Sequence, residues 1–315
     1  MTPHIRPADT PDRAIAEMAQ HQFGVFSRQQ ARQAGLSRHQ MDTRLGNGRW
    51  ETLHPGVFRL RGAPDSPAAT AVAGLLYAGA QAWFSHATSA RLHGIEPHLW
   101  HRWIWITVPV AVQRLARPGL KIVRSRRIDG FTATAHGHPV MSAERSVVDL
   151  AALLDPPVYQ QVLYDVVSRE VVTVDGILAA ADDFGGRCGI ALVHQAISEF
   201  DPTFESGVEY EADALFRAAG LVFERQVEIR DNGILLARLD FADEGIKLGV
   251  EIDGVRYHSS AQARHYDRER DRALRRRGWQ VERFTTNDVR QRPRSMQRHL
   301  VEVYRERSSG LRLAS

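Results

Sequence analysis

The amino-acid sequence predicts an α/β (α+β) multidomain protein, with an N-terminal helical segment, a mixed α/β middle region and a C-terminal αβββαβ domain. The chain has 315 residues, of which 43% are hydrophobic, so it is too long for one typical domain and apolar enough for several cores. Two helix-capping signals stand before residue 46, and apolar and polar residues alternate over positions 246–253 as they do in a strand.

Three short helices followed by a β-hairpin are expected at the N-terminus. The segments Ser27–Gln30 and Ser37–Gln40 are each typical of a capping box, in which a serine hydroxyl and a glutamine amide satisfy the first backbone groups of a helix. An Ala-Gly-Leu turn at 34–36 separates the two helices. The string WETLHPGVFRL at 50–60 predicts two strands around a His-Pro-Gly turn. This order of elements is typical of a winged helix.

The second of the capped helices is expected to enter a DNA major groove, as recognition helices of this kind do. Arg38 and Gln40 stand at its beginning and are candidates for contacts to base edges. Arg44, Arg49 and Arg59 are candidates for phosphate contacts. The alternative is a small helical domain that serves protein contacts.

The string FSRQQARQAGLSRHQMDTRLGNGRWETLHPGVFRL resembles the N-terminal domain of AbiEi-type antitoxins, and the resemblance covers roughly residues 20–62. Its specific features are the paired capped helices, the Arg-Trp dipeptide and the His-Pro-Gly-Val turn. The resemblance implies a DNA-binding autoregulator. It also makes a cognate toxin or a second copy of this chain a candidate protein partner.

The middle region is expected to alternate helices with a few strands. Helices are predicted at Pro67–Tyr77, His86–Leu92, Ser142–Leu154, Val158–Ser168 and Val174–Ala181, and strands at Trp103–Val108 and Leu120–Arg124. His86 and His93 suggest a metal site, but no carboxylate completes a set, so core or capping histidines are favoured. The strings SHATSARLHG, ITVP and AERSVVDLA resemble the region that follows the winged helix in AbiEi-like proteins, which implies packing, dimerisation or partner contact.

The C-terminal domain is predicted to follow the order αβββαβα. A capping signal at Ser206–Glu209 opens a helix that Gly220 ends. Strands are expected at Val222–Ile229, Leu235–Phe241, Ile246–Asp253 and Trp279–Phe284, and further helices at Ser260–Arg277 and from about Pro293 onward. The predicted domains are therefore 1–62, 63–200 and 201–308, with a tail at 309–315.

Acidic residues gather on one face of the third strand of this domain. Alternation puts Glu251 and Asp253 on the same face, and Asp240 lies on the previous strand. Carboxylates in this arrangement can bind Mg²⁺ or Mn²⁺ together with water and phosphate, and such an ion activates water for phosphodiester hydrolysis. A tight hairpin through residues 242–245 would set Asp240 opposite Lys247, so convergence of the carboxylates would require the strands to splay.

The same region resembles the PD-(D/E)XK nuclease superfamily and, within it, the very-short-patch-repair-like (Vsr-like) family. The matching residues are Arg225-Gln226, Asp240-Phe241, the string LGVEIDG at 248–254, His258, Tyr266-Asp267 with Arg270, Gly278-Trp279, Val281, Arg283-Phe284 and Asn287. The resemblance implies a restriction-endonuclease-like fold with the following roles: metal ligands Asp240 and Glu251, assistance from Glu209, and positioning of water or phosphate by Gln226 and His258. The superfamily lysine is replaced by Asp253, so its electrophilic role would pass to His258 or Arg270.

Structural explanations compete with several of these assignments. Glu209 is explained by its helix cap alone, and Asp267 and Asp271 by a solvated face of an arginine-rich helix. The acidic set is harder to explain without a ligand, because carboxylates on one sheet face repel each other unless a cation or basic partner is present. Arginines on the helix that follows, Arg264, Arg270 and Arg275, are candidates for contacts to the DNA backbone.

The function expected from these observations is a metal-dependent DNA endonuclease aimed by an N-terminal winged helix. The alternative is a non-catalytic DNA-binding regulator of antitoxin type with a degenerate nuclease domain. A net charge of +4 is compatible with a polyanionic partner. A cytoplasmic protein without membrane spans is expected, because no stretch approaches the roughly 18–20 apolar residues of a span. With Cys188 as its single cysteine, the chain cannot form an internal disulfide.

Overall fold

The computed structural model describes residues 10–95, 103–184, 187–204, 206–253 and 261–312, without the side chains of 261–268 and 310–312. The chain forms two compact units, Met1–Leu154 with Val172–His194, and Asp155–Val171 with Gln195–Ser315. The division between them falls inside the middle region that the sequence predicts as one domain. The predicted domain borders at residues 62 and 200 stay predictions.

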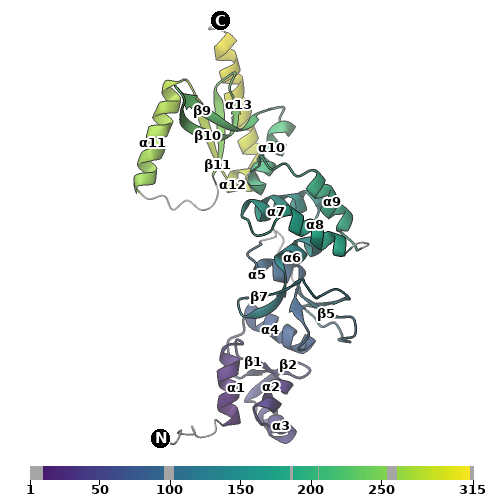
Figure 1. Cartoon of the computed structure of the whole chain (residues 1–315). Helices are drawn as coiled ribbons and strands as arrows, with labels where there is room; N and C mark the ends of the chain where they lie inside the picture. The colour runs from purple at the N-terminus through teal and green to yellow at the C-terminus, as the bar shows by residue number, and fades with distance from the viewer. Residues whose placement is uncertain (1–9, 96–102, 185–186, 205, 254–260, 313–315) are drawn as a thin grey trace, which may run out of the picture. The chain divides into compact units, whose positions relative to one another are not determined.

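The N-terminal part of the first unit contains three helices and a three-stranded sheet of order β1-β3-β2 (Figure 1). Its elements are α1 (Pro11–Gln20), β1 (Val25–Ser27), α2 (Arg28–Gln33), α3 (Arg38–Gly46), β2 (Trp50–His54) and β3 (Val57–Leu60). Both capping boxes are confirmed, since Ser27 with Gln30 and Ser37 with Gln40 exchange side-chain and backbone hydrogen bonds. Strand β1 was not predicted, because three residues are too few to show alternation.

The remainder of the first unit is built around a five-stranded mixed sheet of order β6-β5-β4-β8-β7. Its elements are α4 (Pro67–Ala78), β4 (Trp83–Phe84), α5 (His86–Leu92), β5 (Ile104–Pro109), β6 (Leu120–Ser125), β7 (Thr132–Ala135), β8 (His138–Met141), α6 (Ala143–Leu150) and α8 (Val174–Asp183). The predicted helices and the two longer strands are confirmed, whereas the two- to four-residue strands β4, β7 and β8 were missed. Helix α9 (Ile190–Ser198) has residues in both units.

The second unit is a four-stranded sheet of order β12-β11-β10-β9 with helices on both faces (Figure 1). Its elements are α7 (Pro156–Ser168), α10 (Gly207–Ala218), β9 (Glu224–Asp231), β10 (Ile234–Asp243), β11 (Leu248–Asp253), α11 (Ala261–Arg276), β12 (Gln280–Thr285), α12 (Thr286–Gln291) and α13 (Pro293–Arg312). Strands β11 and β12 are parallel, and the other pairs are antiparallel. Among the described residues, no helix is long and apolar enough to cross a membrane.

Each face of this sheet has its own apolar core. On one face, Phe216 of α10 and Leu300 of α13 pack against Val250 of the central strand. On the other face, Leu274 of α11 and the nearby Trp279 pack against strand residues. The predicted αβββαβα order is confirmed, with α12 as an added short helix before α13.

The hairpin between β10 and β11 differs from the expected one. Asp243 pairs with Leu248, so the turn spans residues 244–247 and not 242–245. Lys247 lies in this turn with a φ of 52°, its ammonium donates to the Arg277 carbonyl at 2.9 Å, and β11 begins after it. The expectation that Asp240 faces Lys247 is therefore wrong, and no splaying of the strands is needed.

Gly207 marks a close approach between α10 and α7. A Cβ atom at this position would lie 2.5 Å from the carbonyl oxygen of Gln161, which is backbone and cannot move aside as a side chain would. We expect Gly207→Ala to lower the free energy of unfolding of the second unit by about 1–3 kcal/mol, the usual cost of overpacking. Urea denaturation followed by circular dichroism measures this change.

Gly46 provides the matched control. It lies at the end of α3, and a Cβ there would meet no atom within 4 Å. Gly46→Ala should be neutral or stabilise by up to about 1 kcal/mol, because alanine has the higher helix propensity. Equal destabilisation by both substitutions would contradict the close approach at Gly207.

Candidate active site

The strand registers of the second unit place four polar residues in one row across its sheet. The register of β9 with β10 aligns Gln226 with Asp240. The register of β10 with β11 aligns Asp240 with Glu251, which pairs directly with Arg283 of β12. We call Gln226, Asp240, Glu251 and Arg283 the polar row. It contains three of the predicted site residues, and Arg283 is the one for which the sequence predicted no role.

The backbone departs from regular strand geometry within this row. Gln226 has a φ of 50°, a left-handed conformation that costs a non-glycine residue free energy. The Asp240 carboxylate accepts a hydrogen bond of 2.7 Å from the backbone N–H of Ile252. Asp240 is therefore fixed against β11, the strand that carries Glu251.

Glu209 joins the row from helix α10. Its side chain is buried, and its two oxygens accept hydrogen bonds from the Ser206 hydroxyl at 2.9 Å and from the Gln226 amide at 3.3 Å. Ser206 also caps the helix by accepting from the Glu209 backbone N–H. The helix cap alone therefore does not explain Glu209, because this carboxylate also contacts an amide of the polar row.

The Glu251 carboxylate is buried at 8% exposure and is held by two guanidinium groups. Its Oε2 atom accepts from Arg283 Nε at 2.7 Å and from Arg270 Nη2 of α11 at 3.0 Å. Burying a carboxylate without a counter-charge is costly, and these two arginines supply that charge. The acidic face was expected to need a cation or a basic partner, and these two arginines are basic partners. Arg270 thus contacts Glu251 in addition to any role on DNA.

Arg283 also links the row to Asp271 of α11. Its Nη1 and Nη2 atoms donate to the two Asp271 oxygens at 3.0 and 2.6 Å. These hydrogen bonds hold the pKa of Asp271 below its usual value and raise the pKa of Arg283. Asp271 was interpreted as part of a solvated helix face. This is wrong, because both oxygens of its carboxylate bind the guanidinium of Arg283.

The metal prediction concerns Asp240 and Glu251. Among the described residues, no group of three His, Cys, Asp or Glu side chains is placed to hold a metal ion. The neighbouring carboxylates of Asp240 and Glu251 have the donor chemistry that Mg²⁺ needs when water and phosphate complete its shell. Asp253 ends the same strand beside Thr285, whereas His258 lies outside the described residues.

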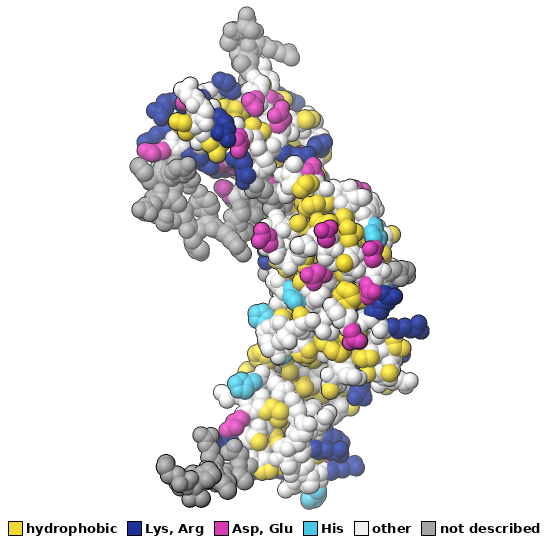
Figure 2. Space-filling model, in the orientation of Figure 1, with side chains coloured by type: hydrophobic (Ala, Val, Ile, Leu, Met, Phe, Trp, Pro, Cys, Tyr) yellow, Lys and Arg dark blue, Asp and Glu magenta, His cyan; other side chains and the backbone are white. Residues whose placement is uncertain are grey.

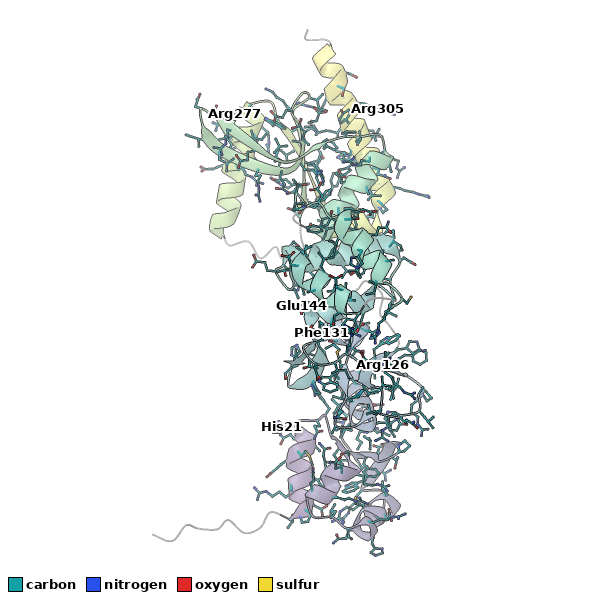
Figure 3. All side chains as sticks on the ribbon, turned by 45° about the vertical axis from the view of Figure 1, so that its right-hand side comes forward. His21, Arg126, Phe131, Glu144, Arg277 and Arg305 are labelled. Atoms are coloured by element: carbon teal, nitrogen blue, oxygen red, sulfur yellow. The ribbon has the colours of Figure 1, made fainter. Side chains whose placement is uncertain are left out.

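Exposed arginines lie elsewhere on the second unit. Arg275 of α11 is exposed, and the side chain of Arg264 lies outside the described residues. A groove of about 830 Å³ between α10 and α13 is lined by Arg294, Arg298 and Arg305. Figure 2 shows Lys and Arg side chains gathered over this unit, and Figure 3 labels Arg305 on α13.

The predicted DNA-contacting residues of the first unit fall into two groups. Arg38 at the start of α3 is 79% exposed and lies 3.8 Å from Asp42, and Arg49 is also exposed. The side chains of Arg44 and Arg59, in contrast, are largely buried in ion pairs. Arg44 binds both oxygens of Asp12 at 2.7 Å, and Arg59 contacts Glu51 at 3.0 Å and Asp65 at 2.9 Å.

These contacts separate exposed candidates from residues with a structural role. Gln40 uses its side-chain oxygen to accept from the Ser37 backbone at 2.8 Å, which completes the capping box. The hydrogen bonds to Arg44 lower the pKa of Asp12 and keep α1 against α3. Contacts of Gln40, Arg44 and Arg59 to DNA stay predictions, and for the two arginines such contacts would compete with carboxylates of the protein.

His86 and His93 have separate structural partners. His86 is buried, stacks on Trp105 with ring centroids 4.7 Å apart, and lies 3.4 Å from Asp149. His93 contacts the Met141 carbonyl at 2.7 Å. Burial lowers the pKa of His86, and Asp149 only partly opposes this shift. The interpretation of both as core or capping histidines is supported by these contacts.

Two protein families match parts of this chain. Residues 13–61 match the AbiEi_4 family, described as "Transcriptional regulator, AbiEi antitoxin". Residues 209–303 match the restriction-endonuclease-like family REase_MTES_1575. Two of the resemblances inferred from the sequence are therefore confirmed, an AbiEi-antitoxin-like domain at the N-terminus and a restriction-endonuclease-like domain at the C-terminus, whereas the Vsr-like assignment and the resemblance of the middle region stay predictions. Together they support a DNA-binding role of nuclease-like or antitoxin type.

Two proteins of Mycobacterium tuberculosis are similar to this chain over most of its length. They are uncharacterized protein MT2308 of strain CDC 1551 / Oshkosh and uncharacterized protein Rv2248 of strain ATCC 25618 / H37Rv. Each is 25% identical over 276 residues, which cover 82% of this chain and 93% of the relative. The match therefore spans nearly the whole of both relatives.

The ion pair of Arg283 with Asp271 predicts a pH dependence of stability. Because the pKa of Asp271 is depressed in the folded state, its contribution is complete above its ordinary value of 3.8 and is lost as the pH falls through the lower, folded value. We expect Arg283→Gln to remove this component. The difference in unfolding free energy between wild type and variant should then shrink below about pH 4.

Urea denaturation at pH 7, 5 and 3.5 measures this difference. Arg230→Gln is the matched control, because Arg230 pairs with Glu228 on the exposed edge strand β9. That control should change stability by less than about 1 kcal/mol at each pH. A constant difference between wild type and Arg283→Gln over the whole range would contradict the role given to Asp271.

Proposed function

We propose that this protein is a DNA-binding endonuclease whose C-terminal domain hydrolyses phosphodiester bonds with a divalent metal ion. The observation that carries the proposal is the alignment of Gln226, Asp240 and Glu251 in one row, with Glu209 contacting the amide of Gln226. These residues come from three strands and a helix, and the strand registers together with the hydrogen bond between Gln226 and Glu209 bring their polar groups together.

In this proposal Asp240 and Glu251 would hold Mg²⁺ or Mn²⁺. When bound, such an ion lowers the pKa of a water molecule and neutralises charge on the phosphate. The hydrogen bond from Ile252 N–H would fix the direction of the Asp240 carboxylate. Glu209 would orient the Gln226 amide, which would in turn position a water molecule or a phosphate oxygen.

The lysine of the superfamily has no equivalent at position 253, so another cation must stabilise charge on the phosphate. Arg270 and Arg283 already place their guanidinium groups on Glu251, at 3.0 and 2.7 Å. A planar guanidinium can bind two phosphate oxygens at once. Arg270 would turn from Glu251 to the scissile phosphate, while Arg283 would stay in place because Asp271 holds its other nitrogen atoms.

A second function is favoured by the same two arginines. They balance the charge of Glu251 without any metal ion, which is what a degenerate nuclease fold would need in order to remain stable. The protein would then be a non-catalytic regulator of antitoxin type that binds DNA through its N-terminal domain. The match of residues 13–61 to transcriptional regulators is compatible with this alternative.

Metal-dependent cleavage separates the two functions. With Mg²⁺ or Mn²⁺ the full-length protein should cleave duplex or single-stranded DNA, and Glu251→Gln or Asp240→Asn should slow cleavage by at least about 10²-fold. DNA affinity should change little, because neither carboxylate attracts phosphates. Gel assays of cleavage and fluorescence anisotropy of binding measure the two quantities.

Glu244→Gln is the control for these variants, since Glu244 is an exposed acidic residue of the β10–β11 turn. It should cleave at the wild-type rate. If the wild type binds DNA but cleaves none of these substrates with either metal, the regulator becomes the better description.

DNA binding by helix α3 is tested by two of its arginines. Arg38→Ala should weaken binding and relax sequence preference, at a cost of about 1–3 kcal/mol for a base contact, with little effect on folding. Arg44→Ala should instead reduce hydrogen-exchange protection of α1 and α3, because it breaks both hydrogen bonds to Asp12. Anisotropy and hydrogen exchange together distinguish the two effects; unchanged affinity in Arg38→Ala would exclude the proposed base contact.

A further inference from the structure

A basic pocket of about 490 Å³ opens in the first unit, away from the nuclease-like sheet. It lies between the end of β6, the two residues that follow this strand, and the end of α8. Its charged lining consists of four arginines and two aspartates: Arg124, Arg126, Arg127, Arg187, Asp182 and Asp183. Figure 3 labels Arg126 on this part of the chain.

The two aspartates of the pocket already have basic partners. Arg127 forms an ion pair with Asp183, and His194 lies 3.8 Å from Asp182. Within the described part of the chain, no carboxylate lies at ion-pair distance from Arg124, Arg126 or Arg187. The pocket therefore has more positive charge than its own acidic residues neutralise.

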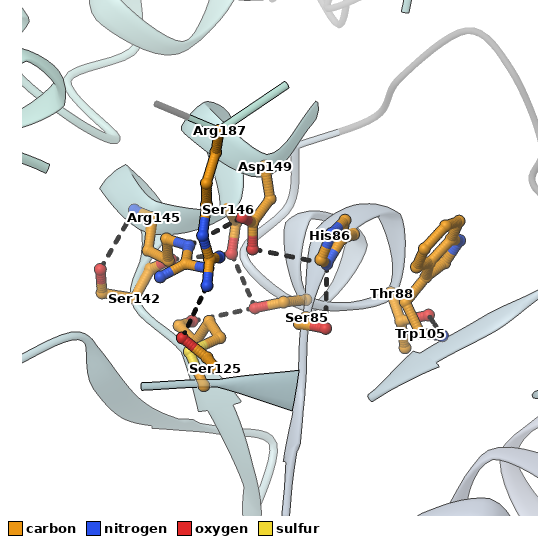
Figure 4. A network of polar contacts seen from close by, with 12 residues as sticks. Ser85, His86, Thr88, Trp105, Ser125, Ser142, Arg145, Ser146, Asp149 and Arg187 are labelled. Atoms are coloured by element: carbon orange, nitrogen blue, oxygen red, sulfur yellow. Dashed lines mark hydrogen bonds and ion pairs between the residues drawn. The ribbon is translucent and has the colours of Figure 1, made fainter. Parts of the chain in front are cut away.

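A buried polar network adjoins the pocket through Arg187, which belongs to both (Figure 4). Arg145 has no exposed surface, and its guanidinium stacks 3.4 Å from the centre of the Phe184 ring that lines the pocket. Its Nε atom donates to Asp149 at 2.7 Å. Its Nη1 and Nη2 atoms have no hydrogen-bond partner among the described residues. A buried guanidinium is thus only partly satisfied by the protein.

Arg187 connects the buried groups to the pocket. It donates to the Ser125 hydroxyl at 3.1 Å and lies 5.0 Å from the centre of the Phe184 ring. Burial, and next the charge of Arg145, lowers the pKa of Arg187. Asp149 forms an ion pair with Arg145, opposes the lowering of the Arg187 pKa and also lies 3.4 Å from His86. An anion in the pocket would balance the remaining charge.

We propose that this pocket binds a compact anion bearing phosphate groups, such as a pyrophosphate or the phosphates of a nucleotide. Guanidinium groups match pairs of phosphate oxygens, and several arginines converge here around a volume typical of small-molecule sites. Asp182 and Asp183 lie among the lining residues and interrupt the positive surface, which suits a compact ligand better than the extended backbone of DNA. The middle of the chain would then sense or require a small phosphorylated ligand.

Calorimetric titration of the full-length protein with pyrophosphate at constant ionic strength tests this assignment. We expect one binding site per chain. Arg187→Gln should weaken binding by about 10–100-fold, the loss expected for a hydrogen bond between charged groups. Arg124→Gln is the second variant, because Arg124 is exposed and its replacement should leave folding intact. It should weaken binding by a similar factor.

Arg305→Gln on α13 is the matched control for nonspecific attraction, and it should bind pyrophosphate like the wild type. The proposal is overturned if the wild type does not bind, or if all three variants bind equally well. A short DNA duplex serves as competitor. Displacement of pyrophosphate by the duplex, with lower duplex affinity in Arg187→Gln, would assign the pocket to the DNA backbone and overturn its assignment to a compact ligand.

Discussion

The charge balance of Glu251 determines how the C-terminal domain is put together. This carboxylate is buried on the central strand β11, where an uncompensated charge would strongly destabilise the fold. Arg270 and Arg283 reach it from α11 and β12, the two elements that follow β11 in the chain. Asp271 then binds Arg283 from the helix. One buried carboxylate thus fixes a strand, a helix and the parallel neighbour strand to one another.

The same arrangement explains why a nuclease and a regulator are both compatible with this fold. Protein cations at Glu251 keep the acidic row stable when no metal ion is bound. They also lie where a phosphate would need positive charge. The two functions differ in whether Arg270 can leave Glu251 when DNA and a metal ion arrive. Arg283 is less able to move, because three of its nitrogen atoms are engaged by two carboxylates.

The features that could be predicted from the sequence depend on residues that are close together in the chain. Capping boxes depend on residues three positions apart, so Ser27 with Gln30 and Ser37 with Gln40 could be assigned from the sequence and were confirmed. The αβββαβα order and the alternation along β11 followed in the same way. The hairpin turn was predicted two positions too early. Residues 243–245 have the composition of a turn, but Lys247 has a positive φ and belongs to the turn as well.

Partners that are distant in sequence could not be predicted. The sequence does not show that Arg44 would bind Asp12, or that Arg283 would bind Glu251, because both choices depend on how helices and strands pack. Solvent-exposed and paired arginines look the same in a sequence. The sequence therefore showed which residues share a strand face, but not which arginines are paired within the protein.

The two units differ in how their buried arginines are balanced by carboxylates. At Glu251, two guanidinium groups surround one buried carboxylate of strand β11, and a second acidic group, Asp271, binds one of them. At Asp149, the charges of Arg145 and Arg187 also meet one carboxylate, burial lowers the pKa of His86 beside it, and among the described residues no further acid forms an ion pair with either arginine. The first arrangement is closed by the protein alone. In the second, the anion that we propose for the pocket would supply the missing negative charge.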